Sequence, residues 1–178
     1  RWTTDFNISM NRNKLEKLNL QQVYYYTQTS EALSEYVVRM TPGQPLSQFW
    51  GYTAKGVDPE TGMIIYEDYN GDGKVNVADK HYIGDANPLF TAGLTNTISW
   101  KGLNLSFLLT SSVGNDIYNA SKIEMIGMYT GGNQIKDVVR RWRIPGQITD
   151  IPKANELDNL RASTRWIEDG SYLKVKNI

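Results

Sequence analysis

The sequence has 178 residues, with 19 Lys and Arg against 19 Asp and Glu, so its formal net charge at pH 7 is zero. A balanced charge provides no net field that would attract nucleic acid or an anionic membrane surface. The absence of cysteine excludes disulfides, thiolate nucleophiles and cysteine-ligated metal centres. No stretch approaches the roughly 20 apolar residues of a membrane-spanning helix, and the first residues show no signal-peptide pattern. We therefore expect the protein either to be soluble or to enter a membrane as β-strands.

Composition and the opening residues both favour a mainly β fold. Aromatic residues make up 11% of the chain, with 11 tyrosines and 5 tryptophans. The apolar side of the run 2–10 consists of Trp2, Thr4, Phe6, Ile8 and Met10. The residues between them are all polar, so this run predicts a strand with one apolar face. A less regular stretch over 15–30 and a second β-like run over 35–40 follow, before Pro42-Gly43.

The clearest pattern is a hairpin of two alternating runs, 90–100 and 103–110, joined by a tight turn at Lys101-Gly102. Only Asn96 interrupts the apolar face of the first run, and Leu108 is the exception in the second. The apolar positions are Phe90, Ala92, Leu94, Ile98, Trp100, Leu103, Leu105, Phe107 and Leu109. A membrane-spanning strand needs about 9 to 11 residues of this kind. A hairpin in a soluble β-sandwich shows the same alternation, so periodicity leaves both interpretations open.

We predict a long structured loop over 111–164. Within it, the runs 117–129 and 134–142 have weak helical spacing. The basic cluster Arg140, Arg141 and Arg143 is interpreted as a solvated surface of the second short helix, with a ligand-binding role as the less favoured alternative. Residues 171–178 form a final β-like run.

Residues 68–79 carry the one motif with specific chemistry, because they match the calcium-binding loop of an EF-hand. Oxygen-bearing side chains stand at loop positions 1, 3, 5, 9 and 12, with Gly73 at the turn position 6. The predicted ligands are Asp68, Asn70, Asp72, the backbone carbonyl of Lys74, Asn76 and Asp79. Calcium takes about six to eight oxygen ligands in a flexible shell, and this spacing wraps oxygens around one point. The sequence therefore predicts a structural Ca²⁺ site that would hold the loop in place.

The motif departs from an EF-hand at position 12, where Asp79 replaces the usual glutamate and must approach the ion more closely. The resulting pattern resembles the loop of dockerin modules, but a dockerin carries two such loops with helices, and strand-like sequence flanks this one. The alternative to calcium is a connection rich in Asx-turns, in which the same side chains bond to their own backbone.

Enzymatic chemistry is not indicated. The chain contains no Gly-x-Ser-x-Gly elbow, phosphate-binding glycine loop or His-Glu-x-x-His motif. His81 is the only histidine, so a histidine-based triad cannot form within this chain, and we expect His81 to be a packing or surface residue. Adjacent carboxylates such as Glu67-Asp68 and Glu168-Asp169 suit a glycosidase poorly, because neighbouring side chains on a strand point to opposite faces.

One hypothesis for the function is a secreted, calcium-stabilised β-sandwich module that binds glycans. Its candidate substrate-binding residues are Trp50, Tyr52, Tyr66 and Trp142, whose rings could stack on sugars. Packing inside the protein, or a belt at a membrane interface, explains the same aromatic residues. Solubility as a monomer would distinguish this module from a membrane protein.

Several further segments accompany the loop and the hairpin in a recognisable order. They are GQPL at 43–46, FWGY at 49–52, GVDPETG at 56–62, YEDYNGDG at 66–73, IGDANP at 83–88 and RWIEDGSYLKVKNI at 165–178. Their order and spacing resemble the C-terminal region of the SusC/RagA family of TonB-dependent outer-membrane transporters, across nearly the whole chain.

The resemblance implies a mainly β fold class: a partial antiparallel transmembrane β-barrel of C-terminal strands, with long extracellular loops and short helical segments. Residues 1–178 would be a fragment of a single barrel domain, without its N-terminal plug and closing strand. The resemblance further implies import of oligosaccharides or peptides across the outer membrane of a Gram-negative bacterium. TonB would energise this import, a SusD-like surface lipoprotein would be the partner, and outer-membrane lipid would surround the strands. The short turn at Lys101-Gly102 and the long connection 111–164 fit periplasmic turns and extracellular loops, respectively.

Overall fold

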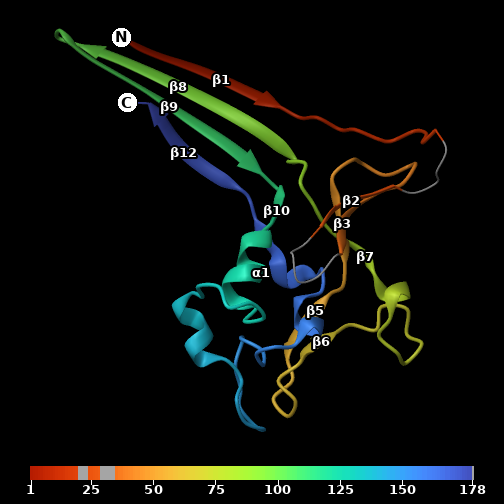
Figure 1. Ribbon diagram of the computed structural model, residues 1–178. Coiled ribbons are helices and arrows are strands. Elements are labelled where there is room, and N and C mark those ends of the chain that lie inside the picture. Colours follow the sequence, from red (N-terminus) through yellow and green to blue (C-terminus); the bar gives the residue numbers. More distant parts are fainter. Residues whose placement is uncertain (20–23, 29–34, 178) are drawn as a thin grey trace.

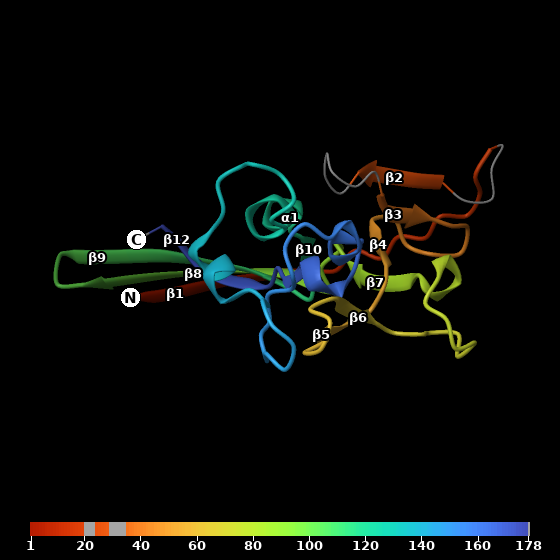
Figure 2. The ribbon, with the colours of Figure 1, turned by 60° about the horizontal axis from the view of Figure 1, so that its bottom comes forward.

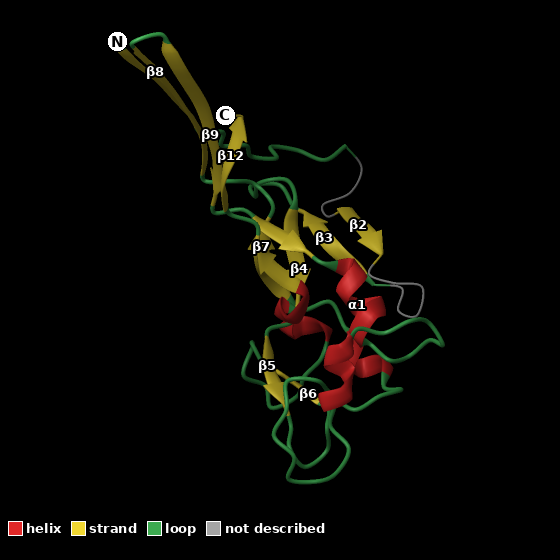
Figure 3. Cartoon of the chain, turned by 90° about the vertical axis from the view of Figure 1, so that its left-hand side faces the viewer, coloured by secondary structure: helices red, strands yellow, loops and turns green. Residues whose placement is uncertain are grey.

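The fold is mainly β and is built from antiparallel sheets. Figure 1 shows the computed structural model, which describes residues 1–19, 24–28 and 35–177, with the backbone alone at 24–28. A long four-stranded sheet stands at one end of the molecule, and the shorter strands and the helices gather at the other end (Figures 1 and 3). Within the described ranges, no helix is long and apolar enough to span a membrane.

The long sheet has the strand order β1-β8-β9-β12, and every neighbouring pair is antiparallel. Its strands are β1 (Trp2–Ser9), β8 (Phe90–Trp100), β9 (Leu103–Val113) and β12 (Tyr172–Asn177). β8 and β9 pair along the full 11 residues of each strand, because alternating apolar residues and a two-residue turn keep them in register. The described parts of the segment between β1 and β8 lie outside this sheet, and we call them the excursion. Among the residues described, the sheet does not close into a barrel.

The excursion forms two smaller sheets. The first has the order β2-β3-β4-β7, and the second consists of β5 and β6. Their strands are β2 (Tyr24–Gln28), β3 (Tyr36–Met40), β4 (Gln48–Gly51), β5 (Ala54–Val57), β6 (Ile64–Tyr66) and β7 (His81–Asp85). After the hairpin, β10 (Asp116–Tyr118) pairs with β11 (Ile167–Asp169), which closes the long loop at its base. Figure 2 shows the long sheet extending to one side of all these elements.

The helical elements are short. They are the α-helix α1 (Ala120–Ile126) and the 3-10 helices η1 (Val77–Asp79), η2 (Lys136–Arg140), η3 (Leu157–Leu160) and η4 (Thr164–Trp166). α1 begins after Asn119, whose side chain accepts a hydrogen bond from the backbone N–H of Lys122 at 3.1 Å. The main hydrophobic core lies here rather than in the long sheet, and it consists of Ile123, Ile126, Ile151, Leu160 and Trp166.

The excursion and the long loop are joined backbone to backbone at Tyr52. Its N–H donates to the carbonyl of Ala162 at 2.9 Å, and its own carbonyl accepts from the N–H of Thr164 at 2.9 Å. The preceding Gly51 makes this approach possible, because a Cβ at that position would lie 2.4 Å from the Ala162 carbonyl oxygen. The excursion and the long loop therefore pack together, and we call their described residues the loop body.

Most strand predictions are confirmed, and the helical prediction is partly wrong. The strand over 2–10, the hairpin with its turn, the run 35–40 and the final strand all form, with Ile178 and part of 15–30 outside the described residues. Ile117 and Tyr118, assigned to a helical run, belong to β10. Pairing with the distant β11 overrides the weak local spacing there, and α1 is left with seven residues.

Candidate functional site

Register across the long sheet brings the apolar positions of all four strands to one face. Partners in register lie on the same side of a sheet, because side chains alternate with a period of two. The cross-strand rows are Trp2–Ile98–Leu105, Phe6–Leu94–Leu109–Val175 and Ile8–Ala92–Ser111–Leu173. We call this surface the apolar face. It extends across strands that are far apart in the sequence, so the alternation within a single strand does not reveal it.

The apolar face is open in the part of the chain that the structure describes. Trp2, Leu103 and Leu173 have 74%, 69% and 74% of their surface exposed. Soluble proteins rarely expose a contiguous apolar patch of more than a few hundred Å². Trp2 and Trp100 stand at the end of the sheet that carries the hairpin turn, where an interfacial tryptophan would sit if the sheet crossed a membrane. The face therefore requires an apolar environment that covers it.

Asn96 is the one polar residue at an apolar position of β8, and neighbouring side chains explain it. It is only 7% exposed. Its Oδ1 accepts hydrogen bonds from the Trp2 indole N–H at 2.9 Å and from the Thr4 hydroxyl at 2.7 Å, both on β1. A buried polar group is tolerated when it is hydrogen-bonded. Asn96 therefore ties β1 to β8 on the apolar face through its buried side-chain oxygen.

The opposite face of the long sheet carries mainly small and polar residues, with Leu108, opposite Thr95, as an apolar exception. Its cross-strand rows are Thr3–Thr97–Ser106, Asn7–Gly93–Thr110–Lys174 and Ser9–Thr91–Ser112–Tyr172. The hydroxyls of Thr97 and Ser106 lie 3.1 Å apart. Gly93 leaves space for the Asn7 amide, since a Cβ there would be 2.9 Å from Asn7 Nδ2. This face is suited to contact with water.

The predicted calcium loop connects β6 to β7, and Asp68 organises its first half. The Asp68 carboxylate accepts backbone N–H hydrogen bonds from Gly71 at 2.8 Å, Asp72 at 3.1 Å and Gly73 at 2.7 Å. Gly71 and Gly73 both have positive φ, at 74° and 83°, which glycine adopts without strain. The glycines of the motif thus allow the chain to turn tightly around the first carboxylate.

Asp79 organises the second half of the loop from a fully buried position. Its carboxylate accepts backbone N–H bonds from Tyr69 at 2.9 Å, Asn70 at 3.2 Å and Asn76 at 2.7 Å. The last of these, with the Asn76 side chain on Ala78 N–H at 2.8 Å, makes the capping box of η1. The hydrogen bond from the Asn76 backbone, followed by those from Asn70 and Tyr69, lowers the pKa of Asp79 although burial opposes this shift.

The remaining predicted ligand groups gather around Asp72. Its Oδ2 accepts from the side-chain amides of Asn70 at 3.2 Å and Asn76 at 3.4 Å, and Asn76 also donates to the Lys74 carbonyl at 3.2 Å. In the described part of the chain, no group of three or more His, Cys, Asp or Glu side chains is arranged to hold a metal ion. The Asx-type bonding expected of the alternative interpretation is present. A carboxylate offers about four lone-pair positions, so these hydrogen bonds do not use all the acceptor positions of the loop's carboxylates. A set of donors made only of oxygen atoms suits calcium.

His81 packs next to the loop, as predicted for a packing or surface residue. Its ring stacks on Tyr69 with centroids 3.9 Å apart. Nδ1 lies 2.9 Å from the Asp79 carbonyl oxygen, and Nε2 lies 3.0 Å from the Thr53 hydroxyl. Both ring nitrogens therefore help to hold the loop, one of them against Thr53, the residue before β5.

Two of the four candidate substrate-binding aromatics are buried. Tyr52 and Tyr66 are 2% and 7% exposed and pack together with Ile64, with ring centroids 5.3 Å apart. The Tyr66 hydroxyl donates to the Asp158 carbonyl at 2.7 Å. Neither tyrosine ring has a face open to a ligand, and both hold the excursion against the long loop.

The other two aromatics are half-buried and also contact the protein. The Arg39 guanidinium lies 3.9 Å from the centre of the Trp50 ring, and Tyr82 packs edge-on to that ring at 5.0 Å. The Trp142 indole N–H donates to the Pro59 carbonyl at 2.7 Å. A cation held on the Trp50 ring occupies the face that a sugar would use.

Comparison with known proteins defines a class. No family model matches the chain. TonB-dependent receptor P3 of Formosa agariphila is 28% identical over 193 residues, which cover 99% of this chain and 19% of that receptor. TonB-dependent receptor P26 of the same organism is 27% identical over 197 residues, with the same coverage. The chain thus spans about a fifth of the length of the curated relatives that it matches, and its similarity to TonB-dependent receptors extends over nearly all of its own length.

Solved structures share the fold. The structure of the RagAB peptide transporter matches with a TM-score of 0.77 and 23% identity, over 98% of this chain and 20% of that chain. The 'closed-closed' state of the RagAB peptide importer matches with a TM-score of 0.76 over the same shares. The fold of the chain is therefore similar to that of part of the RagAB transporter, and the resemblance to TonB-dependent receptors seen in its motifs is confirmed by similarity in sequence.

Proposed function

We propose that this chain forms part of the wall and the outer loops of an outer-membrane transporter that imports a nutrient. The observation that carries this proposal is the apolar face of the long sheet. β8 and β9 have 11 residues each, and a tilted strand needs about 9 to 11 residues to cross the hydrocarbon core. Lipid would cover the apolar face, and the polar face would line the water-filled interior.

The outer strands of the sheet support the same proposal. β1 and β12 each have only one neighbour among the residues described. In lipid, every backbone N–H and C=O must be paired, so a membrane sheet has to close on itself. Further strands of the full-length receptor would therefore continue the sheet at both edges and complete the barrel, of which residues 1–178 are one part.

The arrangement of turns and loops supports an orientation in the membrane. The two-residue turn between β8 and β9 lies at one end of the long sheet, and the helices and the described longer loops lie at the other end (Figure 1). Outer-membrane barrels have short periplasmic turns and longer extracellular loops. We therefore assign the turn to the periplasmic side, and the calcium loop, α1 and the smaller sheets to the outside of the cell.

The transported substrate would be an oligosaccharide or a peptide. The matched RagAB structures are those of a peptide transporter. A SusD-like surface lipoprotein is proposed to act together with the outer loops, and TonB would energise import through parts of the receptor other than this chain. The relatives are named as receptors and transporters, in keeping with the expectation that the chain is not an enzyme.

The test of the transporter proposal uses the full-length protein that contains this chain. Cells are fractionated, and the membrane fraction is run on a detergent gel with and without boiling. A folded barrel in the outer membrane gives a band that shifts on heating. A soluble protein whose mobility does not change would contradict the proposal and favour the secreted, calcium-stabilised β-sandwich.

We also propose that the loop over 68–79 binds one Ca²⁺, which would stabilise the loop. The full-length receptor is heated in detergent with millimolar Ca²⁺ or with EGTA, and cleavage within the loop by a protease is followed. Calcium is expected to slow cleavage, and Asp72→Ala to abolish that protection. Lys74→Ala is the matched control, because its predicted ligand is a backbone carbonyl. Equal cleavage with and without calcium would leave the Asx-turn interpretation.

A further inference from the structure

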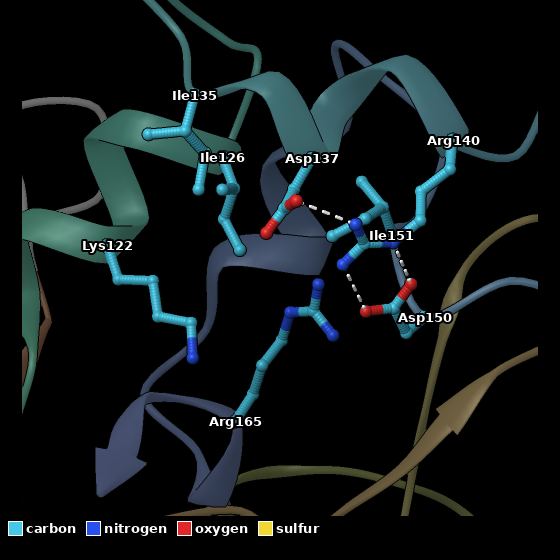
Figure 4. Close-up of a pocket in the computed structure, with 8 residues that line it drawn as sticks. All are labelled: Lys122, Ile126, Ile135, Asp137, Arg140, Asp150, Ile151 and Arg165. Carbon is cyan, nitrogen blue, oxygen red and sulfur yellow. Dashed lines mark hydrogen bonds and ion pairs between the residues drawn. The ribbon is translucent and has the colours of Figure 1, made fainter.

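A small cavity lies inside the long loop, at a place that the proposed function does not use. It has a volume of about 180 Å³ and lies between α1, η2 and η4 (Figure 4). The residues that line it are Lys122, Ile126, Ile135, Asp137, Arg140, Asp150, Ile151 and Arg165. Three isoleucines form an apolar wall, and the remaining five residues carry charge.

Arg140 forms ion pairs with both acidic residues of the cavity. Its Nη1 lies 2.7 Å from Asp137 Oδ1, and its Nε and Nη2 lie 2.7 and 2.9 Å from the two oxygens of Asp150 (Figure 4). The basic cluster that includes Arg140 was interpreted from sequence as a solvated surface, and the Arg140 side chain is half exposed. These ion pairs nevertheless leave neither acid free to neutralise another cation by itself.

Lys122 also forms an ion pair with a carboxylate, whereas Arg165 forms none with the described residues. Lys122 Nζ lies 3.1 Å from Glu168 Oε1. The Arg165 guanidinium points into the cavity (Figure 4), and its Nε is buried without a hydrogen-bond partner. No ion pair to Arg165 is found among residues 1–19 and 35–177. Burial lowers the pKa of this guanidinium, with the charge of Asp150 opposing the shift, which is the behaviour of a cation that lacks a direct counter-ion.

We propose that this cavity binds a carboxylate carried on a short aliphatic stem, with Arg165 as its anchor. The planar guanidinium fork matches the two oxygens of a carboxylate. The wall of Ile126, Ile135 and Ile151 would cover the aliphatic stem, and the free side of the Lys122 ammonium adds positive charge at the cavity.

The same surroundings disfavour a phosphate. The lining carries three cations (Lys122, Arg140 and Arg165) and two anions (Asp137 and Asp150), and its net charge of one matches a single carboxylate better than a phosphate dianion. A carboxylate also leaves the apolar wall in contact with methylene groups rather than with further charged oxygens. The chemical class of the ligand is therefore a small aliphatic monocarboxylate or a solute that ends in one.

The test uses butyrate and its neutral analogue butyramide as probes on the full-length receptor in detergent. Saturation-transfer NMR is expected to show butyrate binding with a dissociation constant on the order of millimolar, as befits so small a ligand. Butyramide should bind at least tenfold more weakly, because it has no charge to pair with Arg165. Arg165→Gln is expected to weaken butyrate binding by roughly tenfold or more and to remove the preference for butyrate.

Lys136→Gln is the matched control, since it removes one positive charge from the same loop at an exposed position that does not line the cavity. It should leave butyrate binding unchanged. Arg165→Lys should retain part of the binding, and thermal unfolding of each variant shows whether the loop still folds. Equal binding of the two probes, or butyrate binding that survives Arg165→Gln in a folded receptor, would overturn the proposal. The measurement requires no transport, so its outcome is independent of the transporter test.

Discussion

Asp79 is the side chain on which the geometry of the 68–79 loop depends most directly, because it is buried and accepts three backbone hydrogen bonds. These bonds lower its pKa below the usual value of 3.8. The carboxylate therefore stabilises the folded loop fully above about pH 3.8, and this contribution is lost as the pH falls through the lower, folded-state pKa. We expect thermal stability at acid pH to decline more steeply with Asp79 than without it.

Asp79→Asn tests this expectation, because asparagine keeps one acceptor oxygen and removes the charge. The variant should be less stable than the wild type at pH 7. The difference between the two midpoints of thermal unfolding should shrink as the pH falls from 5 towards 3. A difference that stays constant over this range would show that the charge of Asp79 does not contribute.

Among individual residues, the sequence could indicate contacts only between side chains that are close along the chain. The loop side chains from Asp68 to Asp79 come together because their spacing alone folds them around the glycines. The role of Asn96 was not predictable, since its donors Trp2 and Thr4 come from a strand more than ninety residues earlier. Arg165 was missed for the same reason: the cavity around it is assembled from separate segments, and no local pattern marks it.

Among the elements, the β8-β9 hairpin offers the sharpest test of local backbone geometry. Lys101 and Gly102 have φ values of 46° and 89°, so both central residues of the turn are left-handed, as in the mirror-image turns that join twisted strands. Gly102→Ala is expected to destabilise the folded receptor by about 1 kcal/mol, because alanine pays a steric cost at positive φ.

Lys101→Asn is the matched variant for the hairpin turn. Asparagine tolerates left-handed backbone better than lysine, so this change should stabilise the receptor by a few tenths of a kcal/mol, roughly. Urea unfolding in detergent measures both variants. Equal effects of the two substitutions would mean that the turn is not limited by its backbone conformation.

The core of the loop body offers a second test of an element's packing, at Trp166. This residue is 1% exposed in the core with Ile123 and Ile126, and its indole N–H donates to the Arg161 carbonyl at 3.0 Å. Trp166→Ala is expected to cost about 3 to 5 kcal/mol through the cavity that it leaves. Trp166→Phe should cost less, since most of the volume remains and mainly the hydrogen bond is lost. Protease sensitivity of the long loop is the measurement, and equal sensitivity of both variants would count against this core.

Element pairing separates what local sequence determines from what it does not. The hairpin was predictable because β8, the turn and β9 are contiguous. The pairing of β1 with β8 and of β10 with β11 was not, because long insertions separate the partners and each strand alone has no signal for its neighbour. Residues 117–118, with their weak helical pattern, instead form a strand through such a distant pairing.

Over the whole molecule, apolar residues serve two different purposes. In the loop body they are buried in two clusters, one around Trp166 and one around Tyr52 and Tyr66. In the long sheet they remain exposed on one face, and β1 and β12 have no buried residue. A sheet of this kind does not fold by burying its own side chains. In the proposed transporter, lipid covers this face. Similarity to TonB-dependent receptors supports that interpretation, whereas periodicity alone left a soluble sandwich open as well.

The two faces of the long sheet can be distinguished by placing the same cation on each. Leu94 lies in the middle of β8 on the apolar face, and Thr95 follows it on the polar face opposite Asp5. If the apolar face lines the outside of a barrel as proposed, Leu94→Arg is expected to destabilise the protein by about 2 to 4 kcal/mol, the cost of an arginine that faces lipid at the midplane. Thr95→Arg should be tolerated, because it would face water and a carboxylate. The measurement is the fraction of heat-shifted, folded receptor after insertion into lipid vesicles, together with its urea unfolding. If Thr95→Arg were as damaging as Leu94→Arg, neither face would be in contact with lipid and the sheet would instead be covered by protein on both sides.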